Sequence, residues 1–380
     1  GDQIKDYLSR LKLEVSLLED NETFNVGIPS FRPFLLREID LIEEVARLNG
    51  FDKIKETSPA AQINPVRFTP KQSAICSVKS LLRDIGFSEI ITYSFIDELG
   101  AKTFQSAFST TTKVNSISLN NPISADMGVM RPSLLPGLVQ SAMTNFSKGQ
   151  KHVRVFEFGN IFVSGERGER EEKMVVSAFI SGVHENNVWE QTGKSYDYYD
   201  LKGTLSAVSR LLKLKLIEQP EPENPFMLKG RSVGLTVDGK ACGYLGELSP
   251  SIIRQYELPK HCIVFELDFD RLVCALPKQV RFLNLPKFPE IYRDISILID
   301  KTVPSGEVID RINQVGGPLL RKVELYDHFE GNKIKEGKKS LTYALTFQSS
   351  DRTLIDEEVN PVFEKIVKIL SSQLGAMLRE

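Results

Sequence analysis

The chain has 380 residues, which is too long for a single hydrophobic core, so we expect two to four domains. Its 48 lysines and arginines are balanced by 50 aspartates and glutamates, and the formal net charge is −2. This balance excludes a protein that binds polyanions over its whole surface, and any contact with nucleic acid must be local.

Four cysteines are scattered along the chain, with no Cys-x-x-Cys pair and no histidine at the spacing of zinc ligands: Cys76, Cys242, Cys262 and Cys274. We expect buried, reduced thiols of a cytosolic protein. No apolar run is long enough for a membrane span, and no signal peptide opens the chain. Since Gly1 lies in what looks like the middle of a domain, we expect a segment of a longer polypeptide.

The first predicted domain covers residues 1–68. Its sequence favours a short helix, then two short strands in a hairpin, then a strong helix over residues 36–49 that ends at Gly50. Spacings of three and four residues place three carboxylates on one side of the strong helix: Asp40, Glu43 and Glu44.

Two interpretations of these carboxylates are open. Carboxylate oxygens gathered on one helix face suit a hard cation such as Mg²⁺. The alternative is a solvated acidic face beside Arg37 and Arg47, and the pattern alone favours this alternative.

The second predicted domain, residues 69–285, mixes helices with strands of antiparallel character, which is typical of an α+β fold. The predicted helices cover residues 71–86, 133–149 and 200–212. The predicted strands cover residues 88–96, 152–163, 172–182, 233–239, 241–248 and 262–269. The sequence of this domain contains no Gly-rich phosphate loop and no nucleophile turn, so nothing in it indicates catalysis.

A linker with prolines opens the third predicted domain, residues 286–380. Its pattern predicts a strand, a helix capped by Ser305 and ended at Gly316, two strands joined by a Lys-rich loop, a helix capped by Thr353, and a short last strand. This order is that of a ferredoxin-like βαββαβ unit. Pro361 lies inside the last predicted helix, where a proline normally kinks or ends the helix.

The middle hairpin of this unit carries candidate RNA-binding residues. Asp327 and Phe329 are two apart near the end of one predicted strand, so they share a face, and Ser340 begins the neighbouring strand. An aromatic ring can stack on an unpaired base while Asp and Ser bond its edge. The alternative is that Phe329 is a core residue and Asp327 a turn residue. Four lysines between the two strands form a candidate basic patch for nucleic acid, although a charge run of this kind is more often a solvated loop: Lys333, Lys335, Lys338 and Lys339.

Six segments, taken in order, resemble the β chain of bacterial phenylalanyl-tRNA synthetase: residues 28–54, 128–138, 154–162, 198–203, 244–248 and 288–300. The resemblance covers the C-terminal half of such a chain. It implies a cytoplasmic heterotetramer of two α and two β chains, in which the α chain holds ATP, phenylalanine and the aminoacylation chemistry. This chain would then be inactive alone, dock the α chain and bind the tRNA(Phe) anticodon. The alternative is a stand-alone paralogue that binds RNA or protein outside a synthetase.

The resemblance also assigns a role to each domain. The first is expected to be the end of a winged-helix-like domain, the second an inactive copy of a class II synthetase core, and the third a ferredoxin-fold anticodon-binding domain. A working class II ATP site uses Arg-x-Glu on one strand, whereas Arg154 and Glu157 are three apart and point to opposite faces. The helices at residues 71–86 and 133–149 are expected to pack against the α chain. The family's editing domain lies upstream of this segment.

The resemblance implies a Mg²⁺ site, favoured here over the solvated face, with three ligands on one helix: Asp40, Glu43 and Glu44. Phe34 stands where the family's first acidic ligand is expected. In the third domain, Asp327, Phe329 and Ser340 fall where the first anticodon base is expected to be held, with Phe329 replacing a more usual tyrosine.

Overall fold

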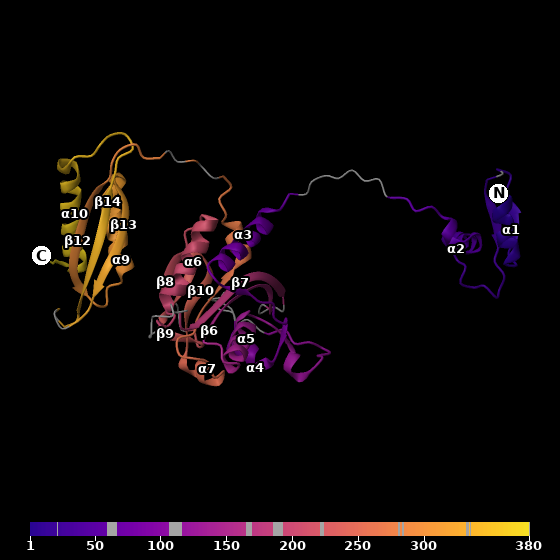
Figure 1. The fold of residues 1–380 in the computed structure, drawn as a ribbon, viewed down its shortest axis with the longest axis horizontal. Helices are drawn as coiled ribbons and strands as arrows, with labels where there is room; N and C mark the ends of the chain where they lie inside the picture. The colour runs from indigo at the N-terminus through magenta and orange to yellow at the C-terminus, as the bar shows by residue number, and fades with distance from the viewer. Residues whose placement is uncertain are drawn as a thin grey trace. The chain divides into compact units, whose positions relative to one another are not determined.

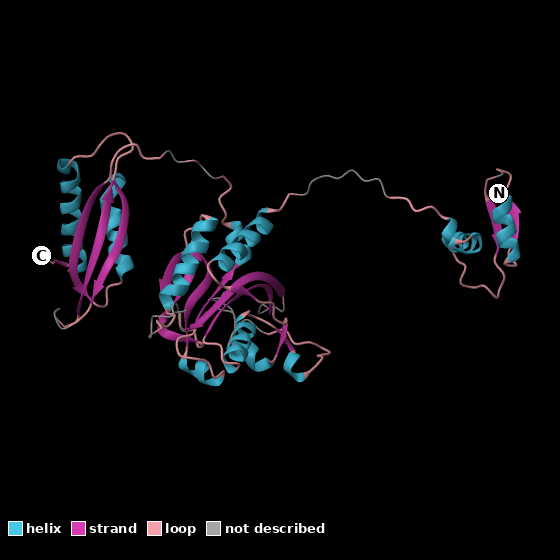
Figure 2. Cartoon of the chain, in the orientation of Figure 1, coloured by secondary structure: helices cyan, strands magenta, loops and turns pink. Residues whose placement is uncertain are grey.

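The computed structural model describes residues 1–20, 22–58, 67–105, 116–164, 169–184, 193–220, 224–279, 282, 285–331, 334 and 336–379 (Figure 1). They form two compact units, one from residues 1–212 and 216–274 and one from residues 213–215 and 275–380. Both units contain helices and strands (Figure 2), which confirms the predicted mixed α+β fold. Within the described residues, no helix is both long and apolar enough to cross a membrane.

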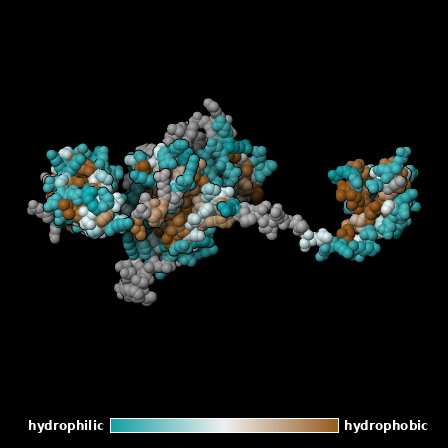
Figure 3. All heavy atoms as spheres, turned by 90° about the horizontal axis from the view of Figure 1, so that it is seen from above, coloured by the Kyte–Doolittle hydropathy of each residue, from teal (hydrophilic) through white to brown (hydrophobic). Residues whose placement is uncertain are grey.

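The described part of residues 1–58 forms a small α/β segment with its own core. Its elements are α1 (Asp2–Arg10), β1 (Glu14–Leu17), β2 (Phe24–Gly27), α2 (Glu38–Asn49) and the 3-10 helix η1 (Phe51–Lys53). Strands β1 and β2 pair antiparallel. Helix α2 has acids in its first turn and Arg47 in its last, as the helix dipole favours, and ends at Gly50 as predicted. The small core leaves several apolar side chains exposed (Figure 3).

The central part is built on a seven-stranded sheet in the order β3-β6-β7-β11-β10-β9-β8. These strands are β3 (Ser88–Glu89), β6 (His152–Ser164), β7 (Arg170–Gly182), β8 (Ile217–Pro220), β9 (Met227–Val237), β10 (Lys240–Leu248) and β11 (Ile263–Asp268). All neighbours pair antiparallel except β3 and β6, which are parallel. All of β11 is buried because helices cover both faces of the sheet.

The helices of the central part lie in two layers (Figure 1). Helices α4 (Glu98–Thr103), α5 (Leu135–Ser147) and α7 (Pro250–Gln255) lie on one face, and α5 packs on Val153, Val155 and Phe179 of the sheet. Helices α3 (Pro70–Asp84), α6 (Tyr198–Leu212) and α8 (Phe269–Cys274) lie on the opposite face, where α3 contacts both α6 and α8.

The predicted single strand over residues 88–96 is wrong. The chain leaves the large sheet after β3 and forms β4 (Phe95–Ile96), which pairs with β5 (Val129–Met130) in a separate two-stranded sheet. Between them, the backbone N–H of Ile90 still donates to Phe156 O, while Thr92 donates its N–H and hydroxyl to the carboxylate of Glu157. A side-chain acceptor therefore replaces the strand partner at this position.

The C-terminal domain has the βαββαβ order that the sequence predicts. Its elements are β12 (Ile291–Asp300), α9 (Ser305–Gly316), the 3-10 helix η3 (Gly317–Leu319), β13 (Leu320–Phe329), β14 (Lys338–Phe347), α10 (Asp356–Leu374) and β15 (Met377–Leu378). The sheet order is β13-β14-β12-β15, with antiparallel neighbours. Both helices pack on the sheet face that carries Leu341, Tyr343, Leu345 and Phe347, so the other face is left open.

Two helix starts in this domain differ from the prediction. The N-cap of α9 is Pro304, and Ser305 is its first residue instead of its cap. The helix ends at Gly316 as predicted, and it is followed by Gly317, whose φ of +62° suits glycine. Helix α10 begins after Ile355 rather than at Thr353, because the carboxylate of Glu358 accepts the N–H of Ile355. Pro361 lies within α10, and the helix continues through it.

The four cysteines are free, and the expectation that all are buried is wrong for two of them. Cys242 and Cys262 are buried in the central part, where burial raises the pKa of each thiol to about 12. Cys76 on α3 and Cys274 at the end of α8 are exposed, because these positions face away from the sheet.

Candidate functional site

The open sheet face of the C-terminal domain brings the three predicted anticodon residues together. In the β13–β14 ladder, Phe329 pairs with Ser340 and Asp327 pairs with Thr342. Directly paired residues point to the same face, and so do residues two apart on a strand. Asp327, Phe329 and Ser340 therefore share the face that the two helices leave uncovered.

A β-bulge produces this arrangement. The register of β13 shifts between Leu325 and Asp327, with Tyr326 as the extra residue. Leu325 pairs with Tyr343 on the core face, so without the bulge Asp327 would point to the core face as well. Tyr326 stays exposed, and partial desolvation together with the Asp294 carboxylate raises its pKa.

Phe329 is 38% exposed and lies outside the core of the domain, which excludes the alternative that it is a core residue. Asp327 is exposed beside it. Gly331 lies against the ring edge, because a Cβ added there would be 3.2 Å from the Phe329 Cζ. A ring and a carboxylate thus lie next to each other on an accessible surface.

Ser340 differs from the other two residues because it is only 1% exposed. Its hydroxyl accepts a hydrogen bond of 3.2 Å from Nη1 of Arg379. Arg379 follows β15, and its backbone N–H donates to Ser296 O over 2.9 Å. The guanidinium therefore reaches across β12 to β14, and Arg379 belongs to this site.

The sequence does not indicate Arg379, because it predicts the final strand but not the strand with which it pairs. The position of Arg379 follows only from the pairing of β15 with β12, in which Met377 lies opposite Leu298 and Leu378 opposite Ile297. Of the basic patch, Lys339 donates to Lys301 O over 3.1 Å, and Lys338 pairs with Asp300 in the β12–β14 ladder. Lys333 and Lys335 lie outside the described residues.

The three predicted metal ligands all lie on α2, but two of them are engaged locally. Oδ2 of Asp40 accepts the backbone N–H groups of Leu36 and Arg37, each over 2.8 Å, and these bonds lower the pKa of Asp40. Asp40 therefore caps the start of α2. Glu43 is exposed on the same helix.

Glu44 is held by two arginines. One oxygen pairs with Arg32 Nη2 over 2.5 Å, and the other accepts from Arg47. The hydrogen bond from Arg47, with the charge of Arg32, lowers the pKa of Glu44. In the part of the chain that the structure describes, no group of three or more His, Cys, Asp or Glu side chains is placed to hold a metal ion. The residues present therefore do not fit the Mg²⁺ site that the sequence predicts.

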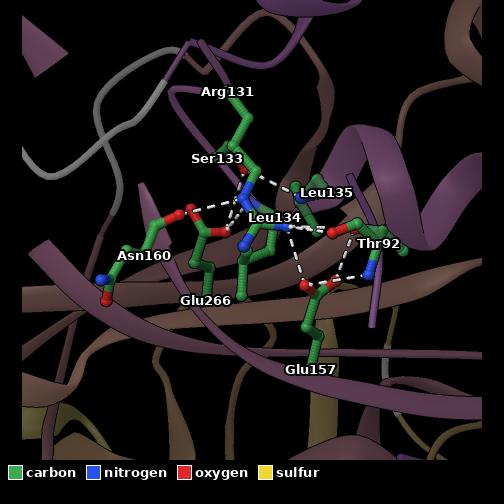
Figure 4. Close-up of polar contacts among 8 residues, drawn as sticks. All are labelled: Thr92, Arg131, Ser133, Leu134, Leu135, Glu157, Asn160 and Glu266. Atoms are coloured by element: carbon green, nitrogen blue, oxygen red, sulfur yellow. Dashed lines mark hydrogen bonds and ion pairs between the residues drawn. The ribbon is translucent and has the colours of Figure 1, made fainter. Parts of the chain in front are cut away.

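The central part contains a buried ion pair between Arg131 and Glu157 (Figure 4). Nη1 of Arg131 lies 2.7 Å from Oε1 of Glu157, and the two side chains are 6% and 1% exposed. Thr92 donates to Oε2 over 2.7 Å, and Nε of Arg131 donates to Asn160 O over 2.9 Å. The guanidinium also fills the space beside Gly159, where an added Cβ would lie 2.3 Å from Nη2.

Glu266 forms a second buried group beside the first (Figure 4). Its carboxylate accepts the Leu134 N–H over 2.8 Å, the Ser133 hydroxyl over 3.0 Å and the Tyr244 hydroxyl over 3.2 Å. Burial outweighs these bonds and raises the pKa of Glu266 to about 7. The carboxyl group thus holds the start of α5 against the sheet.

Arg154 and Glu157 point to different surroundings, as predicted from their spacing. Arg154 donates to Ile85 O, and its guanidinium lies 4.7 Å from the ring centroid of Phe87. Glu157 is paired with Arg131 instead. The two residues therefore do not form an Arg-x-Glu face.

Three protein-family models match consecutive parts of the chain. The tRNA synthetase B5 domain matches residues 1–51, the phenylalanyl tRNA synthetase beta chain CLM domain matches residues 54–269, and the ferredoxin-fold anticodon binding domain matches residues 286–379. Among solved structures, a pyrrolysyl tRNA synthetase from Desulfitobacterium hafniense is similar with a TM-score of 0.39 and 14% identity, over 56% of this chain and 71% of that one. This last likeness is too weak to carry an argument.

Similar curated proteins are β subunits of phenylalanine–tRNA ligase. That of Geobacillus kaustophilus is 34% identical over 97% of this chain and 45% of its own length. Those of Moorella thermoacetica and Nitrosococcus oceani are 33% and 34% identical, over 99% and 100% of this chain and 46% of each relative. The chain therefore spans about half the length of the curated relatives that it matches.

Proposed function

Because this chain belongs to the phenylalanyl-tRNA synthetase β-chain family, we propose that it serves phenylalanine–tRNA ligase as a non-catalytic segment that binds the tRNA(Phe) anticodon and docks the catalytic α chain. The observation that carries the proposal is the open face of the C-terminal sheet. It presents Phe329 and Asp327 side by side in the segment that matches the anticodon-binding model.

The chemistry of this face suits one unpaired base. Stacking on the ring of Phe329 contributes about 1–3 kcal/mol for one base. The Asp327 carboxylate accepts hydrogen bonds from imino or amino groups on the base edge. Ser340 acts through Arg379, because its own hydroxyl is buried and already accepts from the guanidinium. Arg379 then supplies the positive charge for a phosphate group or for an acceptor on the base.

The central part acts as an inactive, class II-like scaffold in this proposal, and the α chain holds ATP and phenylalanine. The surroundings of Glu157 support the inactive scaffold. Arg131 of the same chain neutralises the charge of Glu157, and residue 155 is not an arginine, so the Arg-x-Glu pattern is absent there. The polar atoms of this buried network satisfy one another. The first domain is then the end of a winged-helix-like domain, in the segment that matches the B5 model.

The α chain would dock on exposed apolar side chains of the central part. Helices α3 and α5 use their apolar residues in their own core, including Val78, Leu82 and Leu138. Ile91, Tyr93 and Ile123 are instead largely exposed near the small β4–β5 sheet. We therefore place the contact there, with the predicted two α and two β chains in the assembly.

Binding to tRNA tests the anticodon part of the proposal. The purified chain should bind a tRNA(Phe) transcript more tightly than the same transcript with a changed first anticodon base, by about 1–3 kcal/mol. It should show no ATP–pyrophosphate exchange alone and should co-purify with a co-expressed α chain. Equal affinity for both transcripts would remove the anticodon role, and exchange activity of the chain alone would remove the non-catalytic role.

A further inference from the structure

We propose that the guanidinium of Arg32 occupies the place of a divalent cation at the acidic face of α2, so that this part of the chain is independent of Mg²⁺. Arg32 Nη2 lies 2.5 Å from Oε1 of Glu44, and the two side chains are only 17% and 13% exposed. A half-buried arginine bound to a carboxylate supplies the positive charge that a bound metal would bring.

The second support is the residue that replaces the expected acid. The Cζ of Arg32 lies 4.8 Å from the ring centroid of Phe34. A ring face attracts a guanidinium, whereas a phenylalanine has no oxygen to bind Mg²⁺. Phe34 therefore favours an arginine cation and disfavours a metal at the same position.

The third support is the use of the remaining oxygens. Both oxygens of Glu44 are taken, one by Arg32 and the other by Arg47. Oδ2 of Asp40 accepts two backbone N–H groups at the start of α2. Mg²⁺ requires oxygen ligands in near-octahedral geometry and gives up its water reluctantly. To bind through Glu44 it would have to displace two guanidinium groups, and Asp40 could offer it only Oδ1 without loss of the helix cap.

Nε of Arg32 is buried and has no hydrogen-bond acceptor within the described residues. This unpaired donor costs stability. An acid at position 34 would therefore offer Arg32 an acceptor before it offered a ligand to a metal. A metal site should therefore appear only in a variant that lacks Arg32.

Hydrogen exchange of α2 in the full chain is the experiment, measured by mass spectrometry in excess Mg²⁺ and in excess EDTA. The wild-type chain should show the same protection of residues 38–49 in both conditions. In Arg32→Met, protection in EDTA should fall about tenfold, because Glu44 loses a half-buried partner. In Arg32→Met combined with Phe34→Asp, Mg²⁺ should restore part of that protection. The matched control, Arg32→Lys, keeps the charge and should stay insensitive to Mg²⁺.

Two results would overturn the proposal. In the first, the hydrogen-exchange protection of α2 in the wild-type chain falls several-fold when EDTA replaces Mg²⁺, and Glu44→Gln no longer shows this fall. The other is unchanged protection in Arg32→Met. Mn²⁺ binding to the wild-type chain, followed by electron paramagnetic resonance, decides the question even where a variant fails to fold. We expect the wild-type chain to show no Mn²⁺ site that depends on Glu44. Mn²⁺ binding that is lost in Glu44→Gln would contradict the proposal.

Discussion

The buried hydroxyl of Ser340 accepts a hydrogen bond from the guanidinium of Arg379 over 3.2 Å. This bond links β14 of the C-terminal domain to the residue that follows its last strand, β15. The bond crosses β12 on the open face of the sheet, because Arg379 is tied to Ser296 by its backbone N–H. A serine that the sequence suggests as a direct base contact is therefore the support of a cation that the sequence does not indicate.

Arg379 and Ser340 should act as one unit in tRNA binding. We expect Arg379→Ala to weaken binding by about 1–2 kcal/mol and to reduce the salt dependence by about one phosphate contact. Ser340→Ala should have a smaller effect and should add nothing in the Arg379→Ala background. The measurement is fluorescence anisotropy of labelled tRNA(Phe) at several salt concentrations, with Arg379→Lys as the control that keeps the charge. Additive effects would instead show that Ser340 contacts the base directly.

Phe329→Ala should weaken tRNA(Phe) binding by about 1–3 kcal/mol through the loss of one stacked base. Phe329→Tyr keeps the ring and should bind at least as well as the wild-type chain. Because Phe329 is 38% exposed and lies outside the hydrophobic core of the domain, the alanine variant should lose less stability than a variant of a core phenylalanine. Filter binding of the same transcript checks affinity, and urea unfolding checks stability. Unchanged affinity in a folded alanine variant would exclude Phe329 from the site.

The buried pair of Arg131 and Glu157 should contribute to stability in a strongly coupled way. Arg131→Met leaves the Glu157 carboxylate buried without its cation, and should lower the free energy of unfolding by about 3–5 kcal/mol. The double variant with Glu157→Leu should be less destabilised than Arg131→Met alone. Urea unfolding followed by circular dichroism measures both.

The control for the buried pair is Arg352→Met. Arg352 is 55% exposed and pairs with Glu358, so its loss should cost at most about 1 kcal/mol. A loss of similar size for Arg131→Met would show that the buried network does not hold the central part together.

The sequence predicts elements wherever apolar periodicity is strong. The alternation in β14 correctly predicts that Leu341 and Tyr343 share the core face, with Thr342 on the other face. The spacing of Arg154 and Glu157 on β6 likewise predicts correctly that their side chains point to opposite faces of the sheet. These features depend only on the geometry of one strand.

The features that the sequence does not predict depend on contacts between distant segments. The bulge at Tyr326 becomes visible only in the pairing of β13 with β14. The strand predicted over residues 88–96 breaks because the side chain of Glu157 takes the N–H of Thr92. The spacing of Asp40, Glu43 and Glu44 on one helix, like the family resemblance that favours Mg²⁺ there, does not reveal that Arg32 already pairs with Glu44.

Glu266 should give the stability of the central part a pH dependence of unusual sign for a carboxyl group. Burial raises its pKa from 4.5 to about 7 in the folded chain. Between these values the folded chain holds a proton that the unfolded chain has lost, so stability falls as pH rises from 4.5 to 7. Below this window both states are protonated, and above it both are ionised, so the contribution is constant there.

The whole step is about 3 kcal/mol, since each pKa unit corresponds to about 1.4 kcal/mol. Glu266→Gln removes the ionisation and retains the shape. Its amide oxygen can accept the Leu134 N–H, while the Tyr244 hydroxyl can turn to accept from the amide nitrogen. The free energy of unfolding of the wild-type chain minus that of Glu266→Gln, measured in urea at several pH values, isolates this group from all other carboxylates. The difference should decline from pH 4.5 to 7; a difference that rises with pH would mean that the three hydrogen bonds outweigh burial and that Glu266 is ionised in the folded chain.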